Sequence, residues 1–265
     1  MTDDQHSSSH NETDDLRADR NQTHSSVYEK LLTELGSKPS LWIPFFVVGF
    51  LLTIVDYLRE RDPLPTESFV SESTFEVTYM LYPTGASETA RSLDAFVDLP
   101  LDVLVYAISL ELLVVGGVAT AGWLTMKRVS EVPYRTRRFA TYLGGVSVLY
   151  FIGRVGNALN LEYSPESLLG GIAALIIIAF IAVRLFLLPA AILHEKNLQT
   201  AFQASWNRSK SHGAALLGLI VTFGLASQWI AEIPLLGVIL SSTIVGTIHA
   251  VSLAILYELY TDPLW

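Results

Sequence analysis

The chain has 265 residues, of which 51% are hydrophobic and only 16% are charged, and its mean hydropathy is +0.41. Soluble domains carry about a quarter charged residues, so this composition is not that of a water-soluble protein. The net charge of −9 argues against a nucleic-acid-binding face, and the absence of cysteine excludes thiolate metal sites and a disulfide framework. These exclusions leave a membrane protein with several spanning segments.

Six long apolar stretches predict an all-α, polytopic transmembrane bundle. Each is close to the roughly 20 residues that a helix needs to cross about 30 Å of hydrocarbon, and none alternates like a spanning β-strand. The stretches are 41–58, 101–126, 139–157, 168–193, 213–231 and 235–257. Too little polar chain remains to cover six helices in a soluble protein, so we expect residues 27–265 to form one membrane domain.

Most of the 17 lysines and arginines lie before the first stretch, in the second connection and in the fourth connection. By the positive-inside rule, we expect a multi-pass protein of the cell membrane with both termini in the cytoplasm. Residues 1–26 contain six acidic residues and only one large aliphatic residue, which predicts a disordered acidic tail. Acidic soluble segments with more arginine than lysine are typical of proteins from salt-loving archaea.

Two short amphipathic helices are expected along the inner membrane interface. The first follows the acidic tail and the second precedes the fifth apolar stretch. Their apolar faces consist of Tyr28, Leu31, Leu32 and Leu35, and of Leu198, Ala201, Phe202, Ser205 and Trp206.

The longest connection, 59–100, is expected on the outer face. Alternation from Phe75 to Leu81 predicts a half-buried strand, with Phe69 and Val70 as its hairpin partner. A turn at 83–85 and a short surface helix over 86–97 would follow. The loop is interpreted as a solvated connector or as a recognition cap, and the connector is favoured.

Ionisable side chains within predicted spans are candidates for function, because burying a charge in lipid is costly. The helical rise of about 1.5 Å per residue brings Glu111, Arg184 and His249 to similar depths. We therefore expect them to form an intramembrane polar network. The network is either a transport pathway or a static contact between helices, and the static alternative is favoured.

A second candidate group lies near the outer ends of the first three stretches. Asp56, Asp102 and Arg154 fall at similar levels, so one arginine could bridge two carboxylates. This spacing predicts an outer ion cluster.

No enzyme motif is apparent. His194 and Glu195 begin like a zinc-protease helix, but the place of the second histidine is taken by Leu198, so two ligands cannot share a face. No phosphate-binding loop, nucleophile elbow or dinucleotide turn is present. We therefore expect no metal, no cofactor and no catalytic residues.

The stretch RLFLLPAAILHEKNLQTAFQASWNRS, from Arg184 to Ser209, resembles the membrane domain associated with glycerophosphodiester phosphodiesterases and its stand-alone relatives. The tyrosine pattern at 256–260 is similar to the end of that domain. The resemblance implies a polytopic fold but no catalysis, because the phosphodiesterase chemistry of such fusions belongs to a soluble domain. The family positions would be Arg184, Pro189, Glu195, Ala201, Ser205 and Trp206.

The expected function is that of a non-enzymatic integral membrane protein that engages membrane lipid, a protein partner or a second copy of itself. Trp206, Arg208 and Lys210 are the candidate contacts to the interface and to anionic headgroups. The alternative is a small-solute or ion transporter that uses Glu111 and Arg184.

Overall fold

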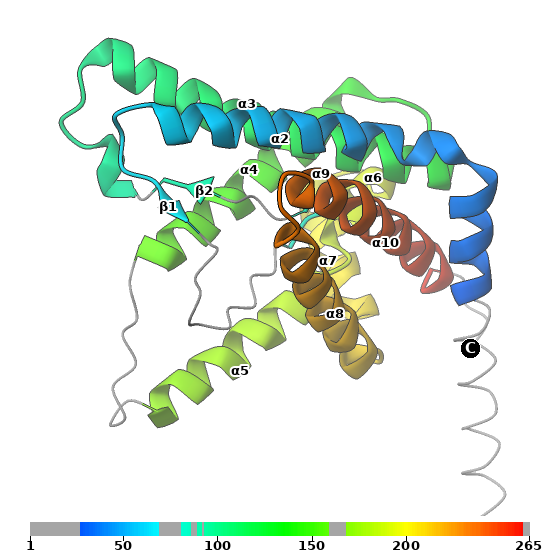
Figure 1. The fold of residues 1–265 in the computed structure, drawn as a ribbon. Coiled ribbons are helices and arrows are strands. Elements are labelled where there is room, and N and C mark those ends of the chain that lie inside the picture. Colours follow the sequence, from blue (N-terminus) through cyan, green and yellow to red (C-terminus); the bar gives the residue numbers. More distant parts are fainter. Residues whose placement is uncertain (1–26, 69–80, 86–88, 92, 159–167, 262–265) are drawn as a thin grey trace, which may run out of the picture.

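The computed structural model describes residues 27–68, 81–85, 89–91, 93–158 and 168–261. Helices dominate these residues (Figure 1). The predicted acidic tail (1–26) and the predicted strands, apart from Leu81 at the end of the second, lie outside them. After a helix over 27–37, the longer helices are α2 (Ile43–Arg61), α3 (Leu101–Ser130), α4 (Thr136–Ala158), α5 (Leu168–Leu185), α6 (Leu188–His194), α7 (Leu198–Arg208), α8 (Gly213–Ala231) and α10 (Thr247–Leu259).

The remaining elements are short. Strands β1 (Glu67–Ser68) and β2 (Thr89–Ala90) pair antiparallel, with Glu67 opposite Ala90. The described part of the predicted surface helix, 86–97, contains the strand β2 and the 3-10 turn η2 (Leu93–Phe96) instead of an α-helix. The other short elements are the 3-10 turn η1 (Pro39–Leu41), the helix α9 (Gly237–Ser241) and the π-helical turn η4 (Ser242–Gly246).

Within the described residues, five helical segments are long and apolar enough to cross a membrane: Pro39–Arg61, Leu101–Ser130, Gly170–His194, Gly213–Ala231 and Gly237–Leu259. This finding confirms the predicted class, an all-α protein with several membrane-length helices. The predicted span at 139–157 is the helix α4, which is less apolar than the others and is not among the five. The number of crossings is therefore not fixed by these five segments alone.

The last helix forms the centre of the bundle. In its most apolar window, Gly237–Leu259 is 78% buried inside the protein, whereas Gly170–His194 is only 22% buried. Helices α2 and α3 run side by side, and α10 packs against α3 (Figure 1). Because lipid is as apolar as leucine, this arrangement is stabilised by close packing rather than by removal of surface from water.

Pro189 divides the fourth predicted span. Helix α5 ends at Leu185 and α6 begins at Leu188, with Pro189 in its first turn. Proline is tolerated there because first-turn amide groups have no partner within the helix. The break frees the carbonyl of Arg184, which accepts a hydrogen bond from the Ser205 Oγ of α7 at 2.8 Å. The small residues Ala201 and Ser205 are fully buried and let α7 approach this break.

Residues 81–85 pack inside the bundle. Tyr82 is 5% exposed, and a Cβ added to Gly122 of α3 would lie 3.7 Å from the Pro83 ring. Gly122 is 21 residues beyond the start of α3, a distance of about 31 Å along the helix. The predicted turn at 83–85 is therefore enclosed by helices. Irregular backbone at this depth is tolerated because protein surrounds it.

Gly85 lies so close to the backbone of Ser242 that a side chain at this position should destabilise the protein. A Cβ at this position would lie 2.3 Å from the backbone nitrogen of Ser242, so alanine cannot fit without a backbone shift. We expect Gly85→Ala to destabilise the protein by about 1–3 kcal/mol, measured as thermal unfolding in detergent. The matched control is Gly144→Ala, because a Cβ at Gly144 meets nothing within 4 Å. Equal stability of the two variants would contradict the packed position of residues 81–85.

Candidate functional site

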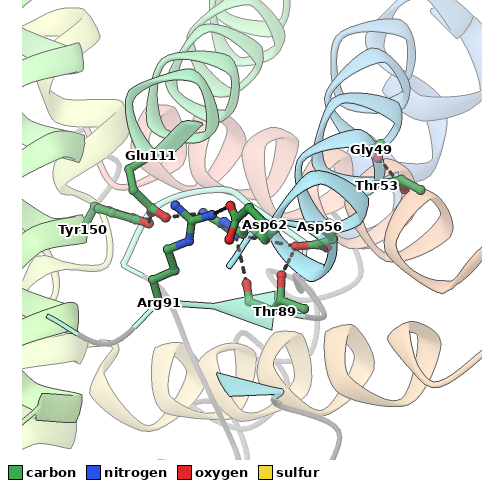
Figure 2. A network of polar contacts seen from close by, with 9 residues as sticks. Gly49, Thr53, Asp56, Asp62, Thr89, Arg91, Glu111 and Tyr150 are labelled. Carbon is green, nitrogen blue, oxygen red and sulfur yellow. Dashed lines mark hydrogen bonds and ion pairs between the residues drawn. The ribbon is translucent and has the colours of Figure 1, made fainter. Parts of the chain in front are cut away.

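The most extensive polar contact lies between α2, α3, α4 and β2 (Figure 2). The Arg59 Nη2 of α2 donates to the Glu111 Oε1 of α3 at 2.6 Å. The second carboxylate oxygen of Glu111 accepts a hydrogen bond from the Tyr150 hydroxyl of α4. Arg59 is 2% exposed and Glu111 is 8% exposed, so this charge pair is held away from solvent.

The same arginine joins β2 and its own helix. Arg59 Nη1 donates to the carbonyl of Thr89 at 2.9 Å and lies 3.5 Å from Asp56 Oδ1. The Thr89 hydroxyl donates to the same Asp56 oxygen at 2.7 Å. Nearby, Arg91 pairs with Asp62 just after α2 ends. We call Asp56, Arg59, Thr89, Glu111 and Tyr150 the buried ion network.

The geometry of the buried ion network is that of a contact holding helices together. A buried charge is costly unless its hydrogen bonds are satisfied, and Glu111 has a donor on each carboxylate oxygen. Because the donors come from α2 and α4, loss of Glu111 would loosen three helices at once. This arrangement supports the static alternative rather than a carrier whose carboxylate must exchange partners.

Glu111 and Arg184 do not meet as predicted. Arg184 lies on α5, where its guanidinium carbon is 4.8 Å from the centre of the Phe180 ring and 5.7 Å from that of Trp206. The arithmetic of helical rise gave the two residues a similar depth but could not show which helices are neighbours. The pairing is therefore corrected: the arginine that binds Glu111 is Arg59.

His249 lies against two aromatic rings in the interior. It is 2% exposed and stacks on Phe223 at 4.7 Å and on Phe186 at 5.7 Å between ring centroids. The stacked rings place the imidazole in the apolar core of α10. Among the described residues, Glu111, Arg184 and His249 therefore contact different partners: Glu111 pairs with Arg59, Arg184 lies over aromatic rings, and His249 stacks on phenylalanines.

Of the predicted outer ion cluster, the structure describes the side chains of Asp56 and Asp102 but not that of Arg154. Asp56 belongs to the buried ion network, where Arg59 and Thr89 hold it. Asp102 is exposed at the start of α3 and has no ionic partner among the residues that the structure describes. The side chain of Arg154 lies outside the described part of the chain.

Arg184 has an unusual environment for a charge in an apolar helix. No carboxylate pairs with it within the described ranges, and its Nε and Nη1 atoms are buried without a hydrogen-bond partner. Its neighbours are the aromatic rings of Phe180 and Trp206, and Phe180 is 49% exposed. Cation–π contacts of this kind stabilise a guanidinium but leave its charge uncompensated.

The three predicted interface residues have different surroundings. Trp206 contacts Arg184 and stacks on Phe202 at 5.7 Å between ring centroids, while Lys210 is exposed without an ionic partner in the described chain. Arg208 points into the protein, where its guanidinium carbon is 4.1 Å from the centre of the Tyr257 ring. Its Nη2 atom is 3.7 Å from the nearest Glu195 oxygen, so its charge is largely compensated.

Arg208 also borders a pocket at the ends of α6, α7 and α10. The lining residues are His194, Glu195, Arg208, Tyr257, Glu258 and Thr261. Just beyond α10, burial raises the pKa of Tyr260 to about 12, so the phenol that stacks on His212 stays neutral near pH 7. The described residues contain no group of three or more His, Cys, Asp or Glu side chains placed to hold a metal ion.

Comparison with known proteins identifies no relative: no family model, curated protein or solved structure matches the chain. The resemblance of residues 184–209 to the membrane domain associated with glycerophosphodiester phosphodiesterases therefore stays a prediction. The candidate sites must be interpreted from their own chemistry.

Sequence reasoning missed Arg59, Thr89 and Tyr150. Arg59 was assigned to the outer connection because the predicted span ended at Leu58, but α2 continues to Arg61. The i, i+3 spacing of Asp56 and Arg59 was the available signal, since residues so spaced lie on one helix face. No sequence signal indicated that Tyr150 would face Glu111.

The buried ion network predicts coupled effects of mutation. We expect Arg59→Met to destabilise the protein by about 3–5 kcal/mol, because Glu111 and Asp56 would remain buried without their cation. The double variant Arg59→Met/Glu111→Leu should recover part of that loss. Thermal unfolding of these two variants and of Glu111→Leu alone, in detergent, measures the coupling.

The control is Arg61→Met, which removes an exposed arginine that lies 4.2 Å from the centre of the Tyr57 ring. This substitution should change stability by about 0.5 kcal/mol or less. A double variant whose loss equals the sum of the two single losses would exclude the coupling.

Proposed function

We propose that this chain is a non-enzymatic integral membrane protein that binds anionic phospholipid at the surface formed by α5 and α7. The observation that carries the proposal is the Arg184 guanidinium, which has no acidic partner among the described residues although it lies in an apolar helix. A charge in this setting is costly unless a counter-ion accompanies it. The phosphate of a lipid headgroup is the counter-ion that a membrane supplies, and its oxygens match the guanidinium geometry.

The surroundings of Arg184 support a lipid ligand. Leu198 and Phe202 of α7 are 50% and 45% exposed, as expected for side chains that contact acyl chains. Trp206 combines an apolar ring with an N–H donor, which suits the membrane interface. Lys210, two residues after the end of α7, is exposed and adds a second positive charge for the same headgroup region.

We further infer six crossings, with both ends of the membrane domain on the cytoplasmic side. The Lys30 Nζ of the first helix lies 3.2 Å from the Glu258 Oε2 at the end of α10. Five crossings between these residues would place them on opposite faces of the membrane, whereas six bring them to the same face. Helix α4 has 23 residues, enough for about 35 Å at the helical rise, and supplies the sixth crossing.

The crossing number can be tested by labelling, because the chain contains no cysteine. Single cysteines replacing Ser37 and Thr261, which are both exposed, report the two ends of the membrane domain. In intact cells, a membrane-impermeant thiol reagent should label neither variant, and permeabilisation should expose both. Labelling of one end alone in intact cells would indicate an odd number of crossings.

For lipid binding, we expect Arg184→Gln to reduce retention of an anionic phospholipid roughly fivefold, since a basic residue near a charged membrane surface contributes about 1 kcal/mol. The measurement is native mass spectrometry of the purified protein after exposure to phosphatidylglycerol. Phosphatidylcholine should show no difference between the variant and the unaltered protein.

The matched control is Arg61→Gln, because Arg61 also lies over an aromatic ring but is on α2. Its phosphatidylglycerol retention should equal that of the unaltered protein. An equal fall in both variants would assign the effect to overall charge, and no fall in Arg184→Gln would reject the site.

A further inference from the structure

A second, separate site is suggested by the pocket at the ends of α6, α7 and α10. Its volume is ≈ 330 Å³, at the lower end of the range for ligand pockets. It is lined by His194, Glu195, Arg208, Tyr257, Glu258 and Thr261. The lining combines two carboxylates with one guanidinium, so a small ligand would meet groups of both signs.

One side of the pocket is held rigidly. The Tyr257 ring is stacked on His194, with 4.8 Å between ring centroids. The guanidinium carbon of Arg208 lies 4.1 Å from the centre of the Tyr257 ring. The Tyr257 hydroxyl donates to Glu195 Oε1 at 2.7 Å. Arg208 Nη1 and His194 Nε2 are buried beside the pocket and have no hydrogen-bond partner among the described residues, so an oxygen atom of a ligand that reaches them would satisfy them.

Glu258 on the other side is held weakly. Its side chain is 32% exposed, and its partner Lys30 is 51% exposed. Exposed pairs of this kind contribute little, because both long side chains lose freedom and water screens the attraction. An ammonium group from outside can therefore replace the Lys30 ammonium on Glu258 at small cost.

The charges that line the pocket favour an organic cation as the ligand group that binds Glu258. Arg208 is already engaged by Glu195 and Tyr257, whereas the only ionic partner of Glu258 in the described chain is the exposed Lys30. A metal ion is disfavoured, because no group of three acidic or histidine ligands is placed to hold one within the described residues. A primary ammonium needs only one carboxylate and nearby oxygen acceptors.

We propose that this pocket binds a small zwitterion, with a primary ammonium on Glu258 in place of Lys30 and an anionic oxygen beside Arg208 and His194. Phosphoethanolamine has this chemistry, either as a free solute or as a lipid headgroup. The proposal is independent of lipid binding at Arg184, because it uses other residues and another ligand charge.

The test measures binding of free phosphoethanolamine to the purified full-length protein by isothermal titration calorimetry. We expect Glu258→Gln to weaken binding about tenfold, because a charge-assisted hydrogen bond is lost. Lys30→Gln should strengthen binding by up to about fivefold, because it removes the competing cation. A purely structural role of the Lys30–Glu258 pair would not produce opposite effects in the two variants.

Phosphocholine is the ligand control, since its trimethylated nitrogen cannot donate a hydrogen bond to Glu258. A second arm measures retention of phosphatidylethanolamine from mixed vesicles and separates a lipid headgroup from a free solute. Binding of either free phosphoethanolamine or phosphatidylethanolamine supports the proposal if Glu258→Gln weakens that binding. The proposal is overturned if neither ligand binds, or if Glu258→Gln binds the ligand as strongly as the unaltered protein. Arg61→Gln, which lies outside both proposed sites, should leave phosphoethanolamine binding unchanged. Because the Arg184 site is tested with phosphatidylglycerol, failure at one site is distinguishable from failure at the other.

Discussion

A polar group inside hydrocarbon must find its partner within the protein or in the lipid, and this requirement explains the main contacts of the bundle. Glu111 receives hydrogen bonds from α2 and α4. The carbonyl that the α5–α6 break frees is bound by Ser205. The irregular segment 81–85 is surrounded by α3 and η4. In each case the cost of a bare polar group fixes which elements lie together.

The buried ion network contributes more to the choice of arrangement than to the net free energy of folding. A buried ion pair barely repays its desolvation, whereas removal of one partner is strongly destabilising. Any rotation of α2 that moves Arg59 away from Glu111 therefore breaks a charge pair inside the protein. The network thus selects one relative rotation of α2, α3 and α4 where apolar packing would tolerate several.

The sequence predicted the helices well because crossing length and apolar composition are properties of single segments. The break at Pro189, which the predicted span 168–193 did not include, has an equally local cause, since proline lacks the amide hydrogen. The partners of Glu111 were not predictable in this way, because helical rise gives depth along an axis but neither rotation nor neighbours. Because the first predicted span ended at Leu58, Arg59 was not counted among the residues of the helix. The close approach of residues 83–85 to η4 depends on the absence of a side chain at Gly85, which the sequence analysis did not use.

Arg59 and Arg184 show two solutions to the same physical problem. Arg59 is 2% exposed and obtains its carboxylates from α2 and α3, so its charge serves the interior. Arg184 instead contacts the rings of Phe180 and Trp206 at a more exposed place, where Phe180 is 49% exposed. Since both side chains carry the same charge, the difference lies in what their helices face. A guanidinium with internal carboxylates needs no lipid, whereas in the proposed lipid site a headgroup phosphate would be the counter-ion of Arg184.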